Sequence, residues 1–279
     1  MTTQGKLQTL SAFTQTPDGG NPAGVWIGET FPPDSEMQEI AKVVGYSETV
    51  FVTPAKGKQR SVRYFSPEAE VPFCGHATIA AGVALANEGN DGAFVFETKS
   101  GDVTVTTTAD GDVRMATLTS VLPSHVIATE TLVEQALDAL HWSLDDLNPS
   151  IPPAVAYAGA FHLVLAVSEK SRLDRLDYDF ESLKALMLEA DLTTLQLVWK
   201  SGESTFDVRN PFPVGGVVED PATGAAAAAL GGYLRDAQLL DAPIRLQLTQ
   251  GEIMGRPSQI VVDIPATGGI SVSGAAVLL

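Results

Sequence analysis

Cysteine, glycine and histidine stand together at residues 74–76, at the start of a run of small apolar residues. This run, residues 77–82, predicts a buried helix whose first backbone N–H groups have no partner inside the helix and carry partial positive charge. Small anions bind at such helix starts. His76 could hold or supply a proton there, and the helix start favours its neutral imidazole. Cys74 is either a buried small hydrophobic residue or a thiol made reactive by the helix N-terminus.

A second stretch of the chain has the same design. Residues 219–225, Glu-Asp-Pro-Ala-Thr-Gly-Ala, lead into an alanine-rich run over residues 226–234. That run also predicts a buried helix, and it is entered through a polar turn that contains glycine. Two such helix entrances indicate a single site that is formed by two similar, repeated parts of the chain.

Glu48 is the third residue whose type could do chemistry. It lies at the mouth of an aromatic and β-branched run, residues 46–52, which we expect to form a strand. Two interpretations stay open, a solvated strand residue and a general base whose pKa is raised by apolar neighbours. Asn21 is similarly open, because Gly19–Pro22 reads either as a plain loop or as a loop on the substrate side.

Composition excludes several classes of partner. The formal net charge is −17, so nucleic acid and anionic membrane surfaces are poor partners, whereas a small anionic substrate can still bind at local N–H donors. The start of the chain lacks the basic and apolar regions of a signal peptide, and no run reaches about 18 apolar residues. A single cysteine excludes an intrachain disulfide, and the four histidines show no metal-ligand spacing. We therefore expect a soluble cytoplasmic protein without a metal or a cofactor.

The elements that must position these residues follow a repeated order. In the first half we expect a helix that ends at Gly45, with Ser35 and Gln38 in capping-box spacing. The strands expected in this half are residues 6–13, 23–27, 46–52, 61–65, 94–97, 102–107 and 113–118. The helices expected in the second half are residues 131–140, 181–189 and 226–234. Its expected strands are residues 154–157, 162–167, 195–199, 205–208, 244–249, 259–264 and 269–279.

Two halves of similar length, each with strands around one apolar helix, resemble a duplication. We expect the first half to span residues 1–120, with residues 266–279 returning to it, and the second half to span residues 121–265. Residues 120–124 are the expected crossover between the halves.

Several motifs, in this order, resemble the PhzF-like (phenazine-biosynthesis) family within the wider diaminopimelate-epimerase-like fold. They are Gly19–Val25, Ser47–Val52, Arg63–Pro67, Glu70–Thr78, Glu219–Gly224, Gln250–Gly251 and Met254–Ser258. The resemblance implies an α+β fold of two pseudo-symmetric halves, each a curved, mostly antiparallel sheet wrapped around a central helix, with the site in the cleft between them. It also implies cofactor-independent isomerase chemistry and, frequently, a homodimer.

Carried over position by position, the resemblance gives roles to individual residues. Glu48 matches the proton-transferring glutamate, and His76 and Asp220 match two supporting polar residues. Gly75 and Gly224 match turns whose backbone amides face the substrate. The predicted substrate-binding residues are Asn21, Cys74, Gly75, Ala77, Thr223, Gly224 and Ala225. The sequence departs from the family at Ala225, where a polar residue is frequent, and in the spacing of Pro211-Phe212-Pro213.

This assignment agrees with the chemistry of the residue types. Removal of a proton next to a carboxylate builds negative charge on oxygen, which two helix N-termini would stabilise without a metal. Glu48 could take the proton from one carbon and return it to another on the same face, a 1,3-proton shift, while His76 or Asp220 holds a second proton.

Two alternatives remain. A cysteine–threonine pair, Cys74 with Thr223, resembles related dehydratases that act on hydroxyproline, whereas a two-thiol racemase is disfavoured by the single cysteine. The second alternative is a non-catalytic binding module that retains the fold, which the all-alanine start of the second helix keeps open.

Overall fold

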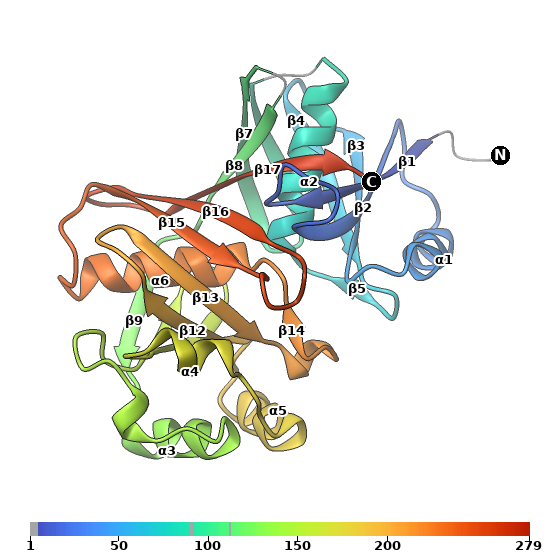
Figure 1. The fold of residues 1–279 in the computed structure, drawn as a ribbon. Helices are drawn as coiled ribbons and strands as arrows, with labels where there is room; N and C mark the ends of the chain where they lie inside the picture. Colours follow the sequence, from blue (N-terminus) through green and yellow to red (C-terminus); the bar gives the residue numbers. More distant parts are fainter. Residues whose placement is uncertain (1–4, 90–91, 112) are drawn as a thin grey trace. The chain divides into compact units, whose positions relative to one another are not determined.

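The computed structural model describes residues 5–89, 92–111 and 113–279 (Figure 1). Contacts between Cα atoms divide the chain into two compact units. Unit 1 consists of Met1–Thr119 and Ser273–Leu279, and unit 2 consists of Ser120–Val272.

The strands of unit 1 close into a ring. Each strand pairs with the next in the order β1-β2-β3-β4-β6-β7-β8-β17, and β17 pairs in turn with β1. The bounds are β1 (Gly5–Ala12), β2 (Asn21–Gly28), β3 (Thr49–Pro54), β4 (Gln59–Phe65), β6 (Ala93–Thr98), β7 (Gly101–Asp110), β8 (Val113–Thr119) and β17 (Ser271–Leu278). The β2–β3 and β4–β6 pairs are parallel, and the β1–β2, β3–β4, β6–β7, β7–β8 and β17–β1 pairs are antiparallel. The two-residue strand β5 (Glu70–Val71) pairs with β4.

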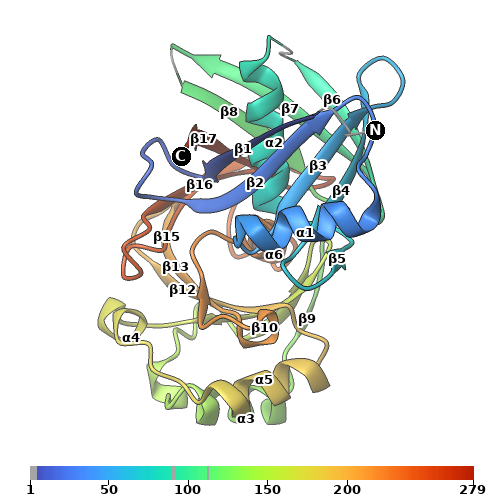
Figure 2. The ribbon, with the colours of Figure 1, turned by 90° about the vertical axis from the view of Figure 1, so that its right-hand side faces the viewer.

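Helix α2 (Gly75–Asn87) is the core of unit 1, and the strands surround it (Figure 2). Its residues from His76 to Ala86 are all buried, because the helix contacts strands on several sides. Small side chains make this close packing possible: a Cβ at Gly82 would lie 2.9 Å from Ala116 Cβ and from Val105 Cγ1. The small-residue run therefore forms a central helix, as the sequence predicts.

Unit 2 repeats the plan. Its strands pair in the order β9-β10-β11-β12-β13-β15-β16. The bounds are β9 (Ser124–Ile127), β10 (Ala154–Tyr157), β11 (Phe161–Ala166), β12 (Thr194–Lys200), β13 (Thr205–Pro211), β15 (Ile244–Gln250) and β16 (Ser258–Ile264). Helix α6 (Gly224–Asp236) packs against this sheet and is buried along most of its length, and β14 (Glu219–Asp220) pairs with β13.

Shorter helices cover the outside of each unit. In unit 1, α1 (Asp34–Val44) buries Met37 and Ala41 in a cluster with Trp26, Phe51 and Phe65. In unit 2 a second hydrophobic cluster joins helices and strands, with Leu183 and Met187 packed among the leucines of β11 and β12. The remaining helices of unit 2 are α3 (Glu130–Ala139), α4 (Lys170–Asp174), α5 (Phe180–Glu189) and the 3₁₀ helices η1 (Leu144–Asp146) and η2 (Pro213–Gly215).

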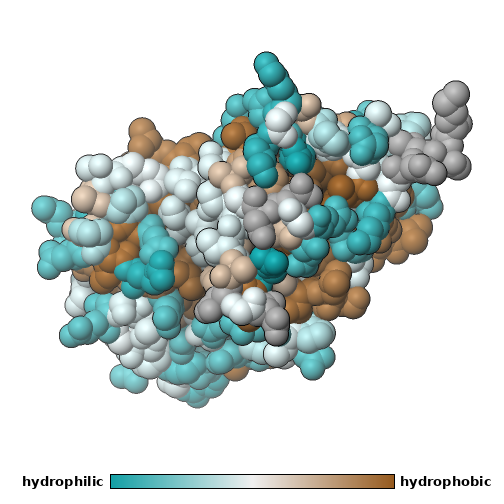
Figure 3. All heavy atoms as spheres, turned by 90° about the horizontal axis from the view of Figure 1, so that it is seen from above, coloured by the Kyte–Doolittle hydropathy of each residue, from teal (hydrophilic) through white to brown (hydrophobic). Residues whose placement is uncertain are grey.

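The surface view in Figure 3 shows polar residues interspersed with smaller apolar areas on the face seen from above. Among the described residues, no helix combines the length and the apolar character that crossing a membrane requires.

Four local expectations need correction. The loop expected at Gly19–Pro22 is shorter, because Asn21 and Pro22 begin β2 and pair with β1. The expected capping box at Ser35 and Gln38 is wrong. Helix α1 begins at Asp34, and its N-cap residue is Pro33, whose ring fixes φ at −54° and whose side chain makes no capping hydrogen bond. Gln38 instead donates from Nε2 to Ser66 O over 2.8 Å. The expected strand at residues 46–52 begins only at Thr49, so Glu48 precedes β3. The short elements β9 and α4 have no counterpart among the expected elements.

Candidate functional site

The start of α2 is fixed by hydrogen bonds to its own first turn and to β4. Thr78 donates from both its backbone N–H and its Oγ1 to Cys74 O, at 3.0 and 2.7 Å. The Tyr64 hydroxyl lies 2.7 Å from Thr78 Oγ1. Tyr64 is fully buried, and burial raises its pKa. Because this hydroxyl stays protonated, β4 holds the first turn of α2 in place at ordinary pH.

Cys74 occupies the N-cap position of α2, but its side chain makes no capping hydrogen bond. Its backbone is extended, with φ −147° and ψ 120°. The N–H groups of Gly75, His76 and Ala77 therefore have no partner within the helix. We call residues Cys74–Ala77 the α2 entrance.

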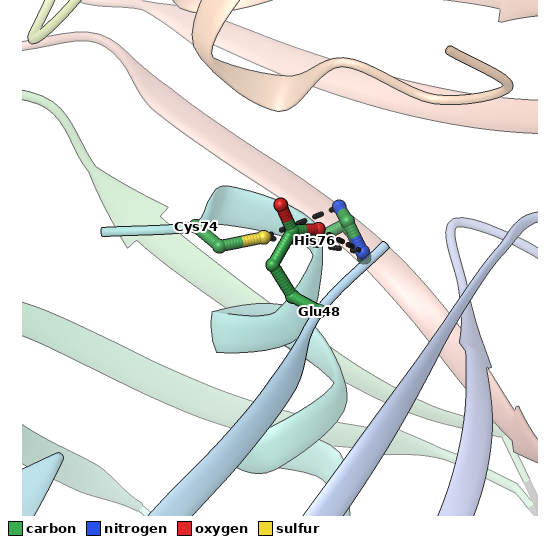
Figure 4. A group of neighbouring side chains, drawn as sticks. All are labelled: Glu48, Cys74 and His76. Atoms are coloured by element: carbon green, nitrogen blue, oxygen red, sulfur yellow. Dashed lines mark hydrogen bonds and ion pairs between the residues drawn. The ribbon is translucent and has the colours of Figure 1, made fainter. Parts of the chain in front are cut away.

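Four side chains gather around the imidazole of His76. Asn21 Nδ2 lies 3.2 Å and Cys74 Sγ 3.3 Å from its Nδ1. Glu48 Oε2 and Ser47 Oγ each lie 3.4 Å from its Nε2. Figure 4 shows Glu48, Cys74 and His76 pointing toward one another.

These contacts select one protonation pattern for His76. The Asn21 amide N–H can only donate, so Nδ1 accepts and the proton of a neutral ring lies on Nε2. This Nε2–H faces Glu48 Oε2, where a carboxylate is the matching acceptor. The side chains of His76 and Glu48 are 7% and 17% exposed, so the pair is shielded while an edge of Glu48 stays accessible.

Backbone pairing between β2 and β3 positions Glu48. Gly24 N donates to Glu48 O over 3.1 Å, and Gly24 lies opposite Thr49 in the parallel pair. A Cβ at Gly24 would lie only 2.5 Å from Thr49 Oγ1. Glycine at this position therefore lets β2 and β3 approach, which fixes the backbone beneath Glu48.

An ion pair holds the chain just before the α2 entrance. Arg63 on β4 binds Glu70 on β5 through two parallel hydrogen bonds, both 2.7 Å long. These bonds lower the pKa of Glu70 to about 2. Because β5 precedes Cys74 by only three residues, this pair anchors the turn that leads into α2.

The start of α6 in unit 2 has a different polar network. Thr223 is its N-cap, and Thr223 Oγ1 donates to Asp220 Oδ2 over 2.6 Å. Gln250 accepts from Thr223 N at 3.0 Å and donates from Nε2 to Asp220 O at 2.7 Å. Gly251 follows with φ +77°, and a Cβ there would lie 2.7 Å from Pro221 O. We call residues Asp220–Ala225 the α6 entrance.

The predicted site residues thus fall into two groups, one in each unit. In unit 1 the structure brings Asn21, Glu48, Cys74 and His76 together at the helix start that contains Gly75 and Ala77. The unit 2 group is Asp220, Thr223, Gly224 and Ala225.

Two polar residues of these networks had no predicted role, Ser47 and Gln250. Both lie inside motifs that the sequence offers, Ser47-Glu48-Thr49 and Gln250-Gly251. Their position within these motifs could have marked Ser47 and Gln250 as candidate site residues. Sequence spacing alone does not show which side chains they contact.

Comparison with known proteins identifies the class first. The chain is 32% identical to YddE of Escherichia coli O157:H7, an uncharacterized isomerase, over 97% of this chain and 95% of that protein. It is 31% identical to an uncharacterized isomerase of Deinococcus radiodurans, over 93% and 86% of the two chains. The crystal structure of a PhzF-family phenazine biosynthesis protein from Bacillus anthracis has the same fold, with a TM-score of 0.87, 24% identity and coverage of 100% and 98%. These relatives place the chain in a class of isomerases.

The family follows from the whole chain. Residues 10–279 match the PhzC-PhzF family of phenazine biosynthesis-like proteins, and the chain belongs to this family. The predicted family and the predicted α+β, diaminopimelate-epimerase-like fold are confirmed.

Proposed function

We propose that this protein shifts a proton on a small substrate that bears a carboxylate, with Glu48 as the base and without a metal or an organic cofactor. One observation carries the proposal. Glu48 Oε2 lies 3.4 Å from His76 Nε2 at the start of a buried helix, so a base, a proton donor and backbone N–H groups occupy one place.

The proposed reaction begins at a carbon next to the carboxylate or to a conjugated carbonyl. Glu48 removes a proton, so that a C–H bond breaks, an O–H bond forms on Glu48, and the electron pair moves toward the substrate oxygen. The N–H groups at the α2 entrance stabilise this charge. Glu48 then returns the proton to a second carbon on the same face, which completes a 1,3-proton shift.

His76 has a supporting role in this proposal. Its Nε2–H faces the Glu48 carboxylate, and Asn21 holds the ring from the other side. The imidazole therefore donates a hydrogen bond to the Glu48 carboxylate before the reaction, and it can donate to the substrate when Glu48 takes up the proton. Asp220 and Thr223 would hold or move a second proton, and their contact with the same substrate stays a prediction.

Solvent deuterium incorporation tests the proposal. The protein is incubated in D₂O with a panel of unsaturated and hydroxylated carboxylates, and proton NMR follows the loss of carbon-bound hydrogen. We expect exchange with the wild type and a near-complete loss in Glu48→Gln. Absence of exchange across the panel would favour a binding protein instead.

A second candidate reaction is favoured by the thiol. Cys74 Sγ lies 3.3 Å from His76 Nδ1, so the imidazole could accept the thiol proton and Cys74 could serve as the base of an epimerase or dehydratase. Cys74→Ser separates the two reactions. If it abolishes turnover while Glu48→Gln does not, the Glu48 proposal fails.

A further inference from the structure

The α2 entrance and Glu48 place three different metal-binding atoms together. Cys74 Sγ, a ring nitrogen of His76 and a carboxylate oxygen of Glu48 all lie within 4.8 Å of one another. Glu48 is far from the other two in sequence, which is why spacing among the histidines does not reveal the set. Sulfur, imidazole nitrogen and carboxylate oxygen are the three donor types that Zn²⁺ takes in proteins.

The separations of these atoms fit one tetrahedral ion. Bond lengths of about 2.3 Å to sulfur and about 2.1 Å to nitrogen and oxygen give tetrahedral edges of about 3.6 Å for S···N and about 3.4 Å for N···O. The structure has 3.9 Å between Cys74 Sγ and His76 Nε2, and 3.4 Å between His76 Nε2 and Glu48 Oε2. These two edges lie within about 0.3 Å of the ideal ones, and the third pair, Cys74 Sγ and the Glu48 carboxylate, lies within 4.8 Å. A rotation of the Glu48 side chain would bring all three atoms onto a single Zn²⁺ and leave its fourth position open.

Charge and burial also fit a dication. Cys74 as a thiolate and Glu48 as a carboxylate would supply two negative charges to the ion. All three side chains are less than one fifth exposed, so water competes weakly for the ion. Asn21 lies against His76 Nδ1, and its amide, turned to present Oδ1, would accept the ring N–H of a metal-bound histidine.

We propose that Cys74, His76 and Glu48 bind Zn²⁺ reversibly, and that bound Zn²⁺ inhibits the enzyme. On binding, the thiol releases its proton to solvent and the imidazole coordinates through Nε2, so its proton moves from Nε2 to Nδ1. The Asn21 amide must then turn so that its Oδ1 accepts from Nδ1–H. Inhibition follows because the ion occupies the Glu48 oxygen and the His76 nitrogen. The binding stands on the geometry alone, whereas the inhibition rests on the proposed function.

Cobalt and zinc titrations test the binding. With Co²⁺ as the probe, we expect the visible bands of a tetrahedral site and a thiolate-to-cobalt charge-transfer band in the near ultraviolet. Calorimetry with Zn²⁺ should show a single tight site. Removal of an outer partner alone weakens metal sites by about 10- to 100-fold, so loss of the ligand in Cys74→Ala or Glu48→Gln should exceed about 100-fold. Mg²⁺, which prefers oxygen ligands, should not compete.

A surface histidine provides the matched control. His141 is exposed in unit 2 and has φ +53°, a conformation that asparagine tolerates, so His141→Asn should leave both titrations unchanged. Thermal unfolding without metal shows whether each variant is folded. Added Zn²⁺ should then raise the Tm of the wild type and of His141→Asn, but not that of Cys74→Ala. Equal Zn²⁺ affinity in the wild type and in Cys74→Ala would overturn the inference.

The deuterium assay separates this inference from the proposed function. The inference predicts that chelator-treated enzyme is active, that Zn²⁺ stops exchange, and that a chelator restores it. Binding without exchange in the metal-free protein would refute the proposed function and leave the metal site standing. Exchange without Zn²⁺ binding would refute only the metal site, and exchange that requires Zn²⁺ would overturn the inhibitory role.

Discussion

The two units pair their strands in the same way. In unit 1, β2 and β3 are parallel, β3 and β4 are antiparallel, and β4 and β6 are parallel. In unit 2 the strands β11, β12, β13 and β15 repeat these three relations in the same order. The short strands β5 and β14 pair with β4 and β13 in turn. Each unit then enters a 13-residue buried helix. A bidentate arginine–glutamate pair joins the same strands in both units, Arg63 with Glu70 and Arg209 with Glu219.

The matched positions carry different side chains. Counted from the strand registers and helix starts, Asn21 corresponds to Gly159, Glu48 to Thr193, Cys74 to Thr223 and His76 to Ala225. Glu48, His76 and Cys74 of the unit 1 site thus each correspond to an uncharged residue in unit 2. In the other direction, Asp220 at the α6 entrance is charged and corresponds to the apolar Val71. The comparison teaches that the two units share a frame but divide the chemistry unequally.

The largest expected effect concerns proton transfer. If unit 1 carries the base, Glu48→Gln lowers the rate of deuterium incorporation by about 1000-fold, in the range for loss of a general base. Asp220→Asn should lower it by only about tenfold, because Asp220 is held by Thr223 and has a supporting role. NMR exchange rates of both variants check this order. A larger loss in Asp220→Asn would place the main proton carrier in unit 2.

The next effect concerns the arginine pairs. The side chains of Arg209 and Glu219 are 11% and 4% exposed, against 23% and 15% for Arg63 and Glu70. Arg209→Met leaves a buried carboxylate and should cost about 3 kcal/mol of unfolding free energy. Arg63→Met should cost about 1 kcal/mol, because Lys99 still pairs with Glu70.

Denaturant unfolding measures both costs. Arg245→Met is the control, because the paired side chains of Arg245 and Asp263 in unit 2 are 65% and 39% exposed and should contribute little. Equal costs for the Arg209 and Arg63 variants would show that burial does not distinguish the two pairs.

A buried histidine of unit 2, at the position where unit 1 has Gly24, gives the protein a pH-dependent stability. In the parallel pair of β11 and β12, His162 occupies the position that Gly24 occupies in the pair of β2 and β3. Complete burial lowers the pKa of His162 from 6.5 to about 3. The unfolded chain therefore binds a proton at this residue below pH 6.5 while the folded chain does not, so acid favours unfolding. Between pH 7 and pH 5 this residue alone should remove about 2 kcal/mol of stability.

Unfolding titrations at both pH values, on the wild type and on His162→Asn, check this loss. The variant should be less stable at pH 7 and should show a smaller change between the two pH values. An unchanged pH dependence in the variant would mean that His162 is protonated in the folded protein.

The smallest effect concerns two buried threonines at matching positions, Thr49 at the start of β3 and Thr194 at the start of β12. Thr194 Oγ1 lies 2.8 Å from His162 Nδ1 and accepts from Asn210 Nδ2 over 2.9 Å, whereas Thr49 Oγ1 is buried with no hydrogen-bond partner. Thr194→Val should cost about 1 to 2 kcal/mol, because it leaves buried polar groups without a partner. Thr49→Val should be neutral or slightly stabilising. A destabilised Thr49→Val variant in denaturant melts would contradict this comparison.

Much of the fold could be predicted from local pattern. The small-residue runs predict α2 and α6, and alternation predicts most strands, because both signals depend on neighbours in sequence. The start of α1 could not be predicted, since Pro33 fixes the backbone there and Gln38 finds Ser66, 28 residues away. The strand β9 has exposed Val126 and Ile127 and lacks the alternation that marks a half-buried strand.

The candidate site was predictable as a set of residues but not as a network. Motif resemblance selects Glu48, Cys74 and His76, and the structure places their side chains together. Asn21 contacts Nδ1 of His76, and Ser47 contacts Nε2. These contacts depend on strand pairing between segments that are distant in sequence. No spacing within the chain carries this information.

The closing strand β17 has a consequence for synthesis on the ribosome. It completes the ring of unit 1 between β1 and β8, yet it is translated after all of unit 2. Unit 2, a continuous segment, can therefore fold while the strands of unit 1 still have two open edges, which are prone to pair with other chains. A nascent chain should be most vulnerable to aggregation until β17 has left the exit tunnel.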